Sequence, residues 1–566
     1  MRKMLLVLLL SLSVTLSRAQ TLIVPALYNG SSYVPITATG PSLPSSPTIY
    51  GLAGYTGSGY AVCTTSGNCG FGPGGSAPAY GAQTQVASAA TVDLGAQATH
   101  NICLTGQTPV TSFGNTATVG QTYLVGFCGT PSSAPIEGGA NLLLPAAGNQ
   151  GTTALAYAKF KPVNGDVLNC TVTTQVSSTN TWNCEQVGAA VSRSPDGYVI
   201  NANGYGTQHT RAAMARVKAN TGSALFVVGP GNSIDMGAKC GTGTDLLNGG
   251  WACSWAAQVA ARYSTAAMPI YDNSFAGDQG AIGAGTPYPT YDPRVTLGAN
   301  WGFSVGSLFG LMAHFTNGTA NNFTFAPTLA FNSIRILYVQ NGLGTASVDV
   351  DGTPVGTINE GGAQALATLT ITGITLATHT ITIVPNNNGD LYVAVIQPYN
   401  STVNAINLIH NGFYGATVAT FDVPGAPPWN PGPMMQYIAA NWAVDNFTMP
   451  LTRNDINSAT AISTYYSGLT GIAGFAGANA DVFFMVDPPA SGDTNFADEI
   501  ATAMYQASAT GGTSGVPLGP VFDTGPQWIN YTIANATGLE SGDGIHPNKP
   551  GLSVLGDDWF RLVNTN

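Results

Sequence analysis

The chain has 566 residues, of which 44% are hydrophobic, but only 8% are charged, against about 25% in an average soluble protein. Its net charge is −11, with 16 basic and 27 acidic residues, which excludes nucleic acid and anionic membrane surfaces as its main partners. The length predicts several domains, and the 71 Gly and 35 Pro residues indicate a chain rich in strands and turns.

The N-terminus has the pattern of an export signal. Met1-Arg2-Lys3 is basic, an apolar run follows from Met4 to Leu16, and Ser17-Arg18-Ala19 supplies the small residues of a cleavage site. We therefore expect residues 1–19 to be a signal peptide and the mature protein to be secreted, periplasmic or extracellular. No later stretch reaches the roughly 18 uninterrupted apolar residues of a membrane span, so we expect none after cleavage.

The eight cysteines fall into four close pairs along the sequence, which favours disulfides in an exported chain. Sequence cannot decide connectivity, and a metal site is the alternative. The metal site is disfavoured because the chain has no Cys-x-x-Cys and no His pair at ligand spacing. We expect no cofactor, and the pairings that we favour are Cys63–Cys69, Cys103–Cys128, Cys170–Cys184 and Cys240–Cys253.

Two regions precede the first helical pattern. Residues 20–85 are rich in Gly, Pro, Ser and Tyr and predict an irregular leader or linker, whereas residues 86–190 alternate short β-like runs with turns and predict a small all-β module. Residues 105–114 (TGQTPVTSFG), 125–129 (VGFCG) and 142–145 (LLLP) resemble, in this order, a β module of phage tail-fibre and related surface proteins. That resemblance implies a structural or presenting role.

An α/β pattern begins near residue 191. Residues 209–220 predict a helix, Ala224–Val228 a buried strand, and residues 255–263 a second helix. Between strand and second helix lies a Gly-rich turn with Ser233. A hydroxyl at the carboxyl end of a strand lies where α/β sheets place their sites.

Residues 285–400 differ, because they contain regular short strands with period-2 alternation and no helical pattern. Turns such as Asp351-Gly352 and Asn388-Gly389 separate these strands, which is typical of a β-sandwich. Since the α/β pattern resumes afterwards, we expect a jelly-roll-like sandwich inserted into an α/β domain formed by residues 191–284 and 401–566.

The resumed α/β pattern predicts strands over residues 405–409, 437–441 and 481–486 and a helix over residues 497–508. A Gly- and Pro-rich loop, Glu540–Gly551, follows near the end of the chain and contains Asp543 three residues before His546. Imidazole can take up and return a proton near neutral pH, and a carboxylate can orient it and stabilise its cation. The alternative is a loop His that merely bonds its neighbouring Asp.

Four of these segments together resemble the successive sequence blocks of the SGNH (GDSL-like) hydrolases, especially members with an inserted β-sandwich. They are Gly231-Asn232-Ser233-Ile234, Gly415, Asp445-Asn446 and Asp543-Gly544-Ile545-His546. The resemblance implies a flavodoxin-like three-layer α/β domain and acyl transfer, with Ser233 as nucleophile, His546 as general base and Asp543 orienting His546. Asn232 departs from the family, which usually has Asp before the Ser.

The resemblance also implies an oxyanion hole made by the N–H groups of Ser233 and Gly415 and an Asn side chain. Asp445 stands in the register of that Asn, with Asn446 next to it. Because a carboxylate would repel an oxyanion, we expect Asn446 to act as the donor, and the alternative is a hole that relies on the two backbone N–H groups alone. Gly277 is an alternative to Gly415, but the whole sandwich would then separate it from Asp445.

The function that the resemblance implies is a secreted serine esterase, most specifically an acetylesterase that removes O-acetyl groups from an acylated polysaccharide. Two alternatives remain open. One is a lipase or phospholipase with the same catalytic residues. The other is a non-catalytic surface or adhesion protein with a decayed hydrolase domain, which Asp445 and the tail-fibre-like module favour.

Overall fold

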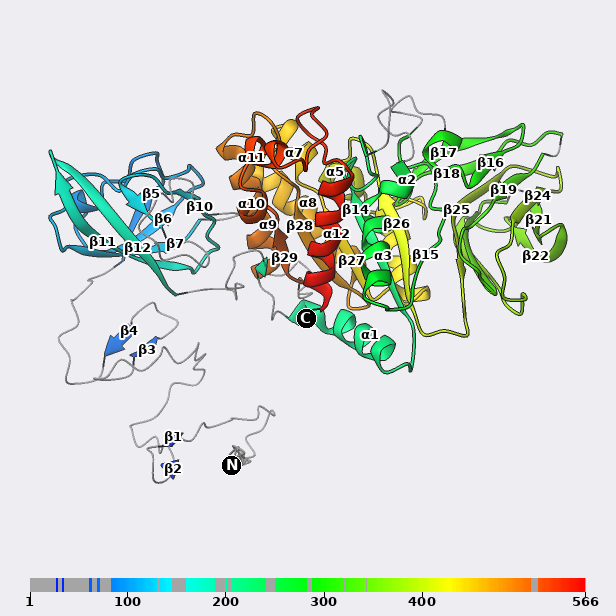
Figure 1. Cartoon of the computed structure of the whole chain (residues 1–566), viewed down its shortest axis with the longest axis horizontal. Coiled ribbons are helices and arrows are strands. Elements are labelled where there is room, and N and C mark those ends of the chain that lie inside the picture. Colours follow the sequence, from blue (N-terminus) through cyan, green and yellow to red (C-terminus); the bar gives the residue numbers. More distant parts are fainter. Residues whose placement is uncertain are drawn as a thin grey trace. The chain divides into compact units, whose positions relative to one another are not determined.

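The chain divides into two units, Met1–Ala79 and Tyr80–Asn566, and each is described by itself (Figure 1). The computed structural model describes residues 27–28, 33–34, 61–63, 69–71, 83–129, 133–144, 159–188, 199–200, 205–240, 250–281, 288–319, 321–342, 344–510 and 518–564. The predicted signal peptide, residues 1–19, lies outside these residues.

The first unit contains two antiparallel strand pairs, β1 (Leu27–Tyr28) with β2 (Tyr33–Val34) and β3 (Ala61–Cys63) with β4 (Cys69–Phe71). The register of β3 and β4 places Cys63 opposite Cys69. The side chains of this pair are outside the described part of the chain, so the Cys63–Cys69 disulfide stays a prediction.

The second unit begins with a β module. Its main sheet has six strands in the order β5-β6-β7-β11-β12-β9. Disulfides join Cys103 to Cys128 and Cys170 to Cys184, which are pairings that the sequence favoured. The strands are β5 (Thr84–Ala87), β6 (Asn101–Thr105), β7 (Thr122–Phe127), β9 (Leu142–Leu143), β11 (Val167–Val176) and β12 (Thr179–Gly188), beside a β8 (Ile136–Glu137) and β10 (Lys159–Phe160) pair.

The segment after β10 contacts the α/β domain. Lys161 Nζ lies 2.8 Å from Asp523 Oδ2 and 3.6 Å from Asp498 Oδ1, and its side chain is only 12% exposed. Val163 is fully buried in the same hydrophobic core as helices of the α/β domain. The module is therefore joined to its neighbour by a buried ion pair as well as by the chain.

The α/β domain is built on a seven-stranded sheet in the order β13-β29-β28-β27-β14-β26-β15. All neighbouring strands are parallel except β13, which runs antiparallel to β29. The strands are β13 (Val199–Ile200), β14 (Ala224–Gly231), β15 (Ile270–Asp272), β26 (Ile406–Gly412), β27 (Asn446–Pro450), β28 (Asp481–Val486) and β29 (Val521–Asp523).

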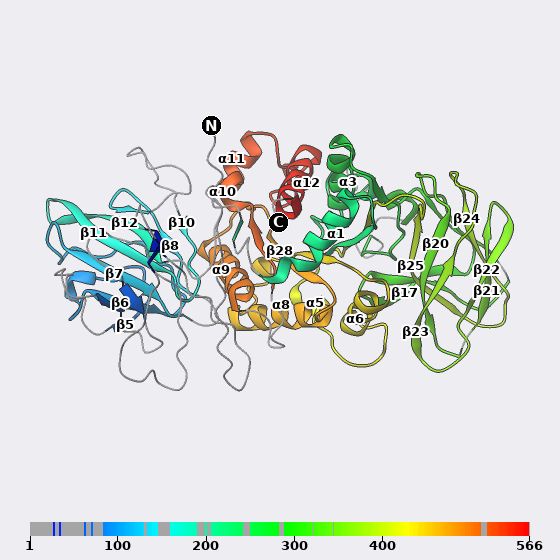
Figure 2. The same cartoon turned by 90° about the horizontal axis from the view of Figure 1, so that it is seen from below.

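Helices cover both faces of this sheet (Figure 2). One face packs against α1 (Gln208–Lys218), α3 (Trp255–Thr265) and α12 (Lys549–Asn564), and the other against α6 (Pro431–Asn441), α8 (Ile462–Ala476) and α9 (Asn495–Thr510). Shorter helices are α2 (Gly250–Cys253), α4 (Tyr288–Tyr291), α5 (Val418–Phe421), α7 (Arg453–Asn457), α10 (Gly525–Trp528) and α11 (Tyr531–Ala536). The disulfide Cys240–Cys253, the remaining favoured pairing, precedes α3.

One predicted strand was wrong. Residues 437–441 belong to α6, which begins with Pro431 at its first turn and buries Met434, Met435 and Ile438 on one face. This spacing of three and four residues is helical, and the short apolar window hid it. The strand of this part of the chain is β27, which begins five residues after α6 ends.

The insertion is a sandwich of two five-stranded sheets, ordered β16-β19-β24-β21-β22 and β17-β18-β25-β20-β23, around one core. Asp351 and Gly352 connect β21 to β22 with φ angles of 49° and 76°, as a tight hairpin turn requires. The strands are β16 (Val295–Leu297), β17 (Trp301–Ser307), β18 (Gly310–Phe315), β19 (Phe323–Phe325), β20 (Ser333–Gln340), β21 (Thr345–Val350), β22 (Thr353–Asn359), β23 (Ala365–Ile371), β24 (Ile381–Pro385) and β25 (Leu391–Tyr399).

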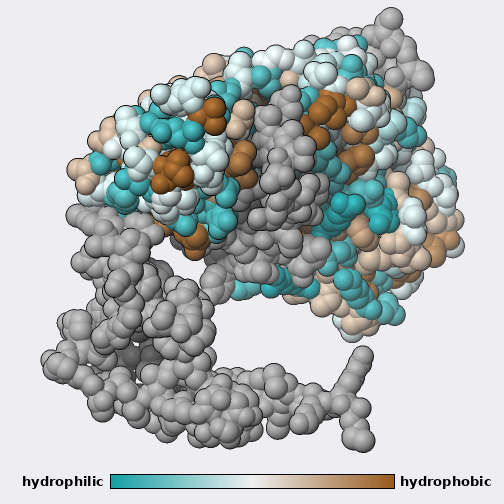
Figure 3. Space-filling model, turned by 60° about the vertical axis from the view of Figure 1, so that its left-hand side comes forward, coloured by the Kyte–Doolittle hydropathy of each residue, from teal (hydrophilic) through white to brown (hydrophobic). Residues whose placement is uncertain are grey.

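On the face shown in Figure 3, hydrophilic and hydrophobic residues are interspersed, and the hydrophobic ones form small patches. Within the described part of the chain, no helix has both the length and the apolar character needed to cross a bilayer. The described residues also contain no group of three or more His, Cys, Asp or Glu side chains arranged to hold a metal ion.

Candidate active site

Ser233 lies in the turn at the carboxyl end of β14, a strand that is buried along its whole length. The turn is closed by the N–H of Ile234, which donates to Asn232 Oδ1 at 2.9 Å. Gly231 is required before it, because a Cβ there would lie 2.2 Å from Asp235 Oδ2. The serine is 4% exposed, so its hydroxyl is presented from a rigid and largely desolvated turn.

His546 lies in the loop that precedes α12. The loop is closed by the N–H of Ser541, which donates to the His546 carbonyl at 2.9 Å. Asp543 Oδ1 accepts the N–H groups of Ile545 and His546, both at 2.9 Å. These backbone bonds fix the Asp543 carboxylate within the loop. An Asp three residues before the His can therefore orient the imidazole ring although neither residue lies in a helix or strand.

The three side chains form one hydrogen-bonded chain. Ser233 Oγ is 2.9 Å from His546 Nε2, and His546 Nδ1 is 2.7 Å from Asp543 Oδ2. Because the carboxylate accepts from Nδ1, Nε2 is left to accept the serine proton. Burial would raise the pKa of Asp543, but hydrogen bonds from the His546 ring and from two backbone N–H groups lower it well below its usual range.

Gly415 follows β26 and is brought to this turn by the N–H of Phe413, which donates to the Gly231 carbonyl at 3.0 Å. Gly415 has a φ of +73°, a conformation that favours glycine. Among the described residues, no hydrogen bond uses the N–H of Ser233 or of Gly415. Both N–H groups are therefore free to donate, and their role in an oxyanion hole stays a prediction.

The expected third donor was placed at the wrong end of the sheet. Asp445 and Asn446 are at the amino end of β27, where Asn446 is in register with Phe226 of β14. Asp445 accepts from Arg216 at 2.8 Å and from the N–H of Leu225 at 3.1 Å. In a parallel sheet the amino and carboxyl ends of strands lie at opposite edges, so neither residue reaches Ser233.

Asn454, which was not predicted from the sequence, lies at the same edge of the sheet as Ser233. It follows β27, and its Nδ2 donates to the Ala416 carbonyl, next to Gly415, at 2.9 Å. A primary amide has two N–H bonds, and the second has no partner among the described residues. The signal was Leu451-Thr-Arg-Asn-Asp455 directly after a buried strand, and it was overlooked because the strand was placed at residues 437–441.

Asp487 holds the loops of the site together. Its Oδ2 accepts from Asn232 Nδ2 at 2.8 Å, from the N–H of Thr452 at 2.9 Å and from the N–H of Arg453 at 2.7 Å. The turn with Ser233 is thereby tied to the turn with Asn454. The bond also accounts for the Asn at position 232, since a second carboxylate facing Asp487 would be repelled.

Arg453 extends this network toward the His546 loop. It is 1% exposed, and its guanidinium pairs with Asp493, with one bond of 2.9 Å, and donates to the Pro488 carbonyl. The N–H of Ser491 in the same loop donates to the Gly544 carbonyl at 2.7 Å. Arg453 therefore helps to keep the loops of the nucleophile and of the base in register.

Gly277, the alternative oxyanion glycine, has another role. It has a φ of +63°, and a Cβ there would lie 2.8 Å from the Phe309 carbonyl and 2.7 Å from the Leu311 carbonyl. Its own carbonyl accepts the hydroxyl of Tyr288 at 3.0 Å. It is a glycine that permits the chain to pass close to the sandwich.

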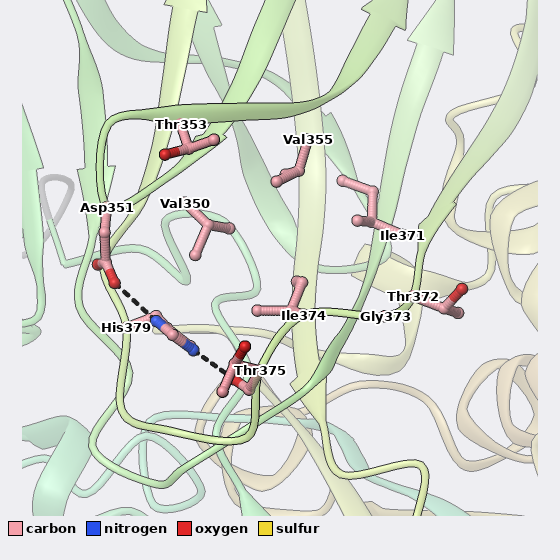
Figure 4. Close-up of a pocket in the computed structure, with 10 residues that line it drawn as sticks. All are labelled: Val350, Asp351, Thr353, Val355, Ile371, Thr372, Gly373, Ile374, Thr375 and His379. Carbon is pink, nitrogen blue, oxygen red and sulfur yellow. Dashed lines mark hydrogen bonds and ion pairs between the residues drawn. The ribbon is translucent and has the colours of Figure 1, made fainter.

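A second Asp–His pair lies in the sandwich, in a hollow of about 440 Å³ lined by residues between Val350 and His379 (Figure 4). His379 Nδ1 is 2.6 Å from Asp351 Oδ2, and its Nε2 is 2.6 Å from the Thr375 carbonyl. Both neighbours offer acceptor oxygens, so this setting favours the protonated ring, in which both nitrogens donate. The Thr375 carbonyl and Asp351 raise the pKa of His379.

No protein-family model matches the chain, and no curated protein sequence does. The structure is similar to a peptidoglycan O-acetylesterase, with 13% identity over 65% of this chain and 100% of that chain and a TM-score of 0.48. It is also similar to a family two carbohydrate esterase from Clostridium thermocellum in complex with cellohexaose (11% identity, 48% of this chain, 98% of that chain, TM-score 0.19) and to Est24, a carbohydrate acetylesterase from Sinorhizobium meliloti (17% identity, 28% of this chain, 79% of that chain, TM-score 0.21). Since these TM-scores lie below 0.5, we base the function on the site.

Proposed function

We propose that the chain is a serine ester hydrolase of SGNH type that removes O-acetyl groups from a polysaccharide. The observation that carries the reaction class is the continuous chain of hydrogen bonds from Ser233 Oγ through His546 to Asp543, at 2.9 Å and 2.7 Å. The polysaccharide part follows from the sequence resemblance alone, and it is therefore tested separately.

In the first half of the reaction, Ser233 Oγ attacks the ester carbonyl while its proton passes to His546 Nε2. Ionised Asp543 stabilises the imidazolium through Nδ1. The negative charge that develops on the carbonyl oxygen is met by the N–H groups of Ser233 and Gly415 and by the free amide N–H of Asn454. His546 then gives the proton to the leaving sugar hydroxyl, and the acetyl group remains on Ser233.

In the second half, His546 takes a proton from a water molecule, which attacks the acetyl carbonyl. The same three donors stabilise the second oxyanion. When this intermediate collapses, His546 returns the proton to Ser233 Oγ and acetate leaves. Every proton is exchanged at Nε2, so the reaction needs only the tautomer that Asp543 maintains.

The non-catalytic alternative has lost one of its supports. It relied on Asp445 repelling an oxyanion, but Asp445 is paired with Arg216 at the other edge of the sheet. The lipase alternative is kept as an outcome of the test, because no observation on the described residues favours a long acyl chain.

The test is hydrolysis of p-nitrophenyl acetate, butyrate and decanoate by the mature protein. The Ser233→Ala variant should lose about 10⁶-fold in kcat. Ser458→Ala, which changes an exposed serine after α7, is the matched control and should retain full activity. Unchanged turnover in Ser233→Ala would reject the reaction class, and decanoate preferred over acetate would favour the lipase. Release of acetate from an acetylated polysaccharide tests the substrate class.

A further inference from the structure

Gln279 lies between β15 and the sandwich and is 3% exposed. Its side-chain Nε2 donates to the carbonyls of His410 at 3.0 Å and of Ala276 at 3.3 Å, and its Oε1 accepts the N–H of Gly412 at 3.1 Å. The Gln279 carbonyl also accepts the N–H of Tyr414 at 2.8 Å. One buried residue therefore holds both the end of β26 and the loop that follows it.

The loop that Gln279 holds contains Gly415, whose N–H we propose as an oxyanion donor. Gly415 is exposed and has a φ of +73°, so neither burial nor a side chain of its own fixes the direction of that N–H. The direction depends on the two preceding residues, Phe413 and Tyr414. The N–H of Phe413 is bonded to Gly231 of the nucleophile turn at 3.0 Å, and that of Tyr414 is bonded to Gln279. These two bonds place the Gly415 donor relative to the nucleophile.

The segment that carries Gln279 is itself fastened to the sandwich. Asp278 exchanges two backbone hydrogen bonds with Leu311 of β18, both 2.8 Å long. Phe275 exchanges two with Ile396 of β25, at 2.8 Å and 2.9 Å. Since β18 and β25 are paired in one sheet, a regular part of the sandwich supports this segment. The inserted domain thereby reaches the oxyanion loop through Gln279.

We propose that Gln279 is a positioning residue, which aims the Gly415 N–H at the developing oxyanion and transmits the support of the sandwich to it. This inference rests on the proposed function. Without the side-chain amide, the Gly412 N–H and two carbonyls would lose their partners, and the loop would shift to satisfy them. A displacement of about 1 Å at a reacting centre costs up to about 10²-fold in rate.

The first test is Gln279→Met, which keeps the size of the side chain and removes its hydrogen bonds. The kcat for p-nitrophenyl acetate should fall at least about tenfold, with KM nearly unchanged, because Gln279 is buried away from the substrate. The kcat is expressed per active site titrated with diethyl p-nitrophenyl phosphate, so unfolded protein is not counted. Gln397→Met is the matched control and should keep its kcat. Gln397 is 1% exposed on β25, and its amide has no hydrogen bond among the described residues.

The second test is Gln279→Glu, which keeps the shape of the side chain. An ionised carboxylate can accept from Gly412 but cannot donate to the carbonyl of His410, whereas a protonated carboxyl group does both. The ratio of its kcat to the wild-type kcat should therefore rise as the pH falls from about 9 to about 5. Division by the wild-type value removes the titration of His546, which both proteins share. A change in packing alone would leave this ratio constant.

Hydrogen exchange followed by mass spectrometry tests the loop without reference to catalysis. The peptide that contains Gly412 and Tyr414 should exchange faster in Gln279→Met than in the wild type, and Gln397→Met should not change it. Unchanged exchange, a fall in kcat of less than tenfold, an effect confined to KM or a constant ratio in Gln279→Glu would overturn the inference. Failure of the proposed function is seen separately, as an inactive wild type or an active Ser233→Ala.

Discussion

Two Asp–His pairs of the described residues share almost the same hydrogen bond from Nδ1 to a carboxylate, but we propose proton transfer for only one of them. His546 Nδ1 is 2.7 Å from Asp543, and His379 Nδ1 is 2.6 Å from Asp351. The difference is at the other nitrogen, where His546 meets the hydroxyl of Ser233 and His379 meets the carbonyl of Thr375. A hydroxyl can give up a proton, whereas a carbonyl can only accept one.

The two surroundings differ as well. The side chain of Asp543 is 25% exposed and that of Asp351 is 54% exposed, while both rings are largely covered. The bond to Asp keeps His546 in the tautomer of a base, but both nitrogens of His379 face acceptors, which favours a protonated ring without a free lone pair. The partner of the second ring nitrogen therefore decides whether an Asp–His pair can act as a base.

The largest expected effect on kcat comes from removing the His of each pair in turn. His546→Ala removes the base and should lower kcat for p-nitrophenyl acetate by about 10⁶-fold, as loss of a triad His does elsewhere. His379→Ala is the matched variant and should leave kcat unchanged, because among the described residues the His379 ring hydrogen-bonds only Asp351 and Thr375, within the sandwich. Circular dichroism checks that both variants fold. A large fall in kcat for His379→Ala would contradict the distinction.

The next effect concerns the two candidate amide donors. Asn454→Ala removes an N–H from the proposed oxyanion hole and should lower kcat by about 10²–10³-fold with KM nearly unchanged. Asn446→Ala instead breaks bonds to Thr210 and Thr448 and should cost about 1–3 kcal/mol of stability without changing kcat. Activity assays and urea unfolding separate the two. The reverse pattern would restore Asn446 as the donor.

The smallest effect concerns pH and the sandwich pair. The pKa of His379 is raised in the folded state, so its contribution to stability is full below the unfolded value of about 6.5 and is lost as pH rises through the folded pKa. At pH 5.5 the free energy of unfolding of the wild type should therefore exceed that of His379→Gln, by less than about 1 kcal/mol because the pair is partly exposed. This difference in stability should vanish at high pH. A difference in unfolding free energy that grows as the pH rises would contradict the raised pKa of His379.

Much of the chemistry could be predicted from local sequence. Asp543 and His546 are three residues apart, and backbone bonds within one loop hold them, so no distant contact was needed to recognise them. The turn with Ser233 is equally local, with Gly231 and Asn232 shaping it. The period-2 pattern of the sandwich was also sufficient where a strand buries one face, as β21 and β24 do.

Only the tertiary structure points to Asn454, the third donor that we propose. Residues 437–441 are apolar in a window too short to distinguish a strand from α6, and this error moved the expected donor from Asn454 to Asn446. Whether a side chain reaches Ser233 depends on which edge of the sheet it lies at, and sequence spacing does not carry that information.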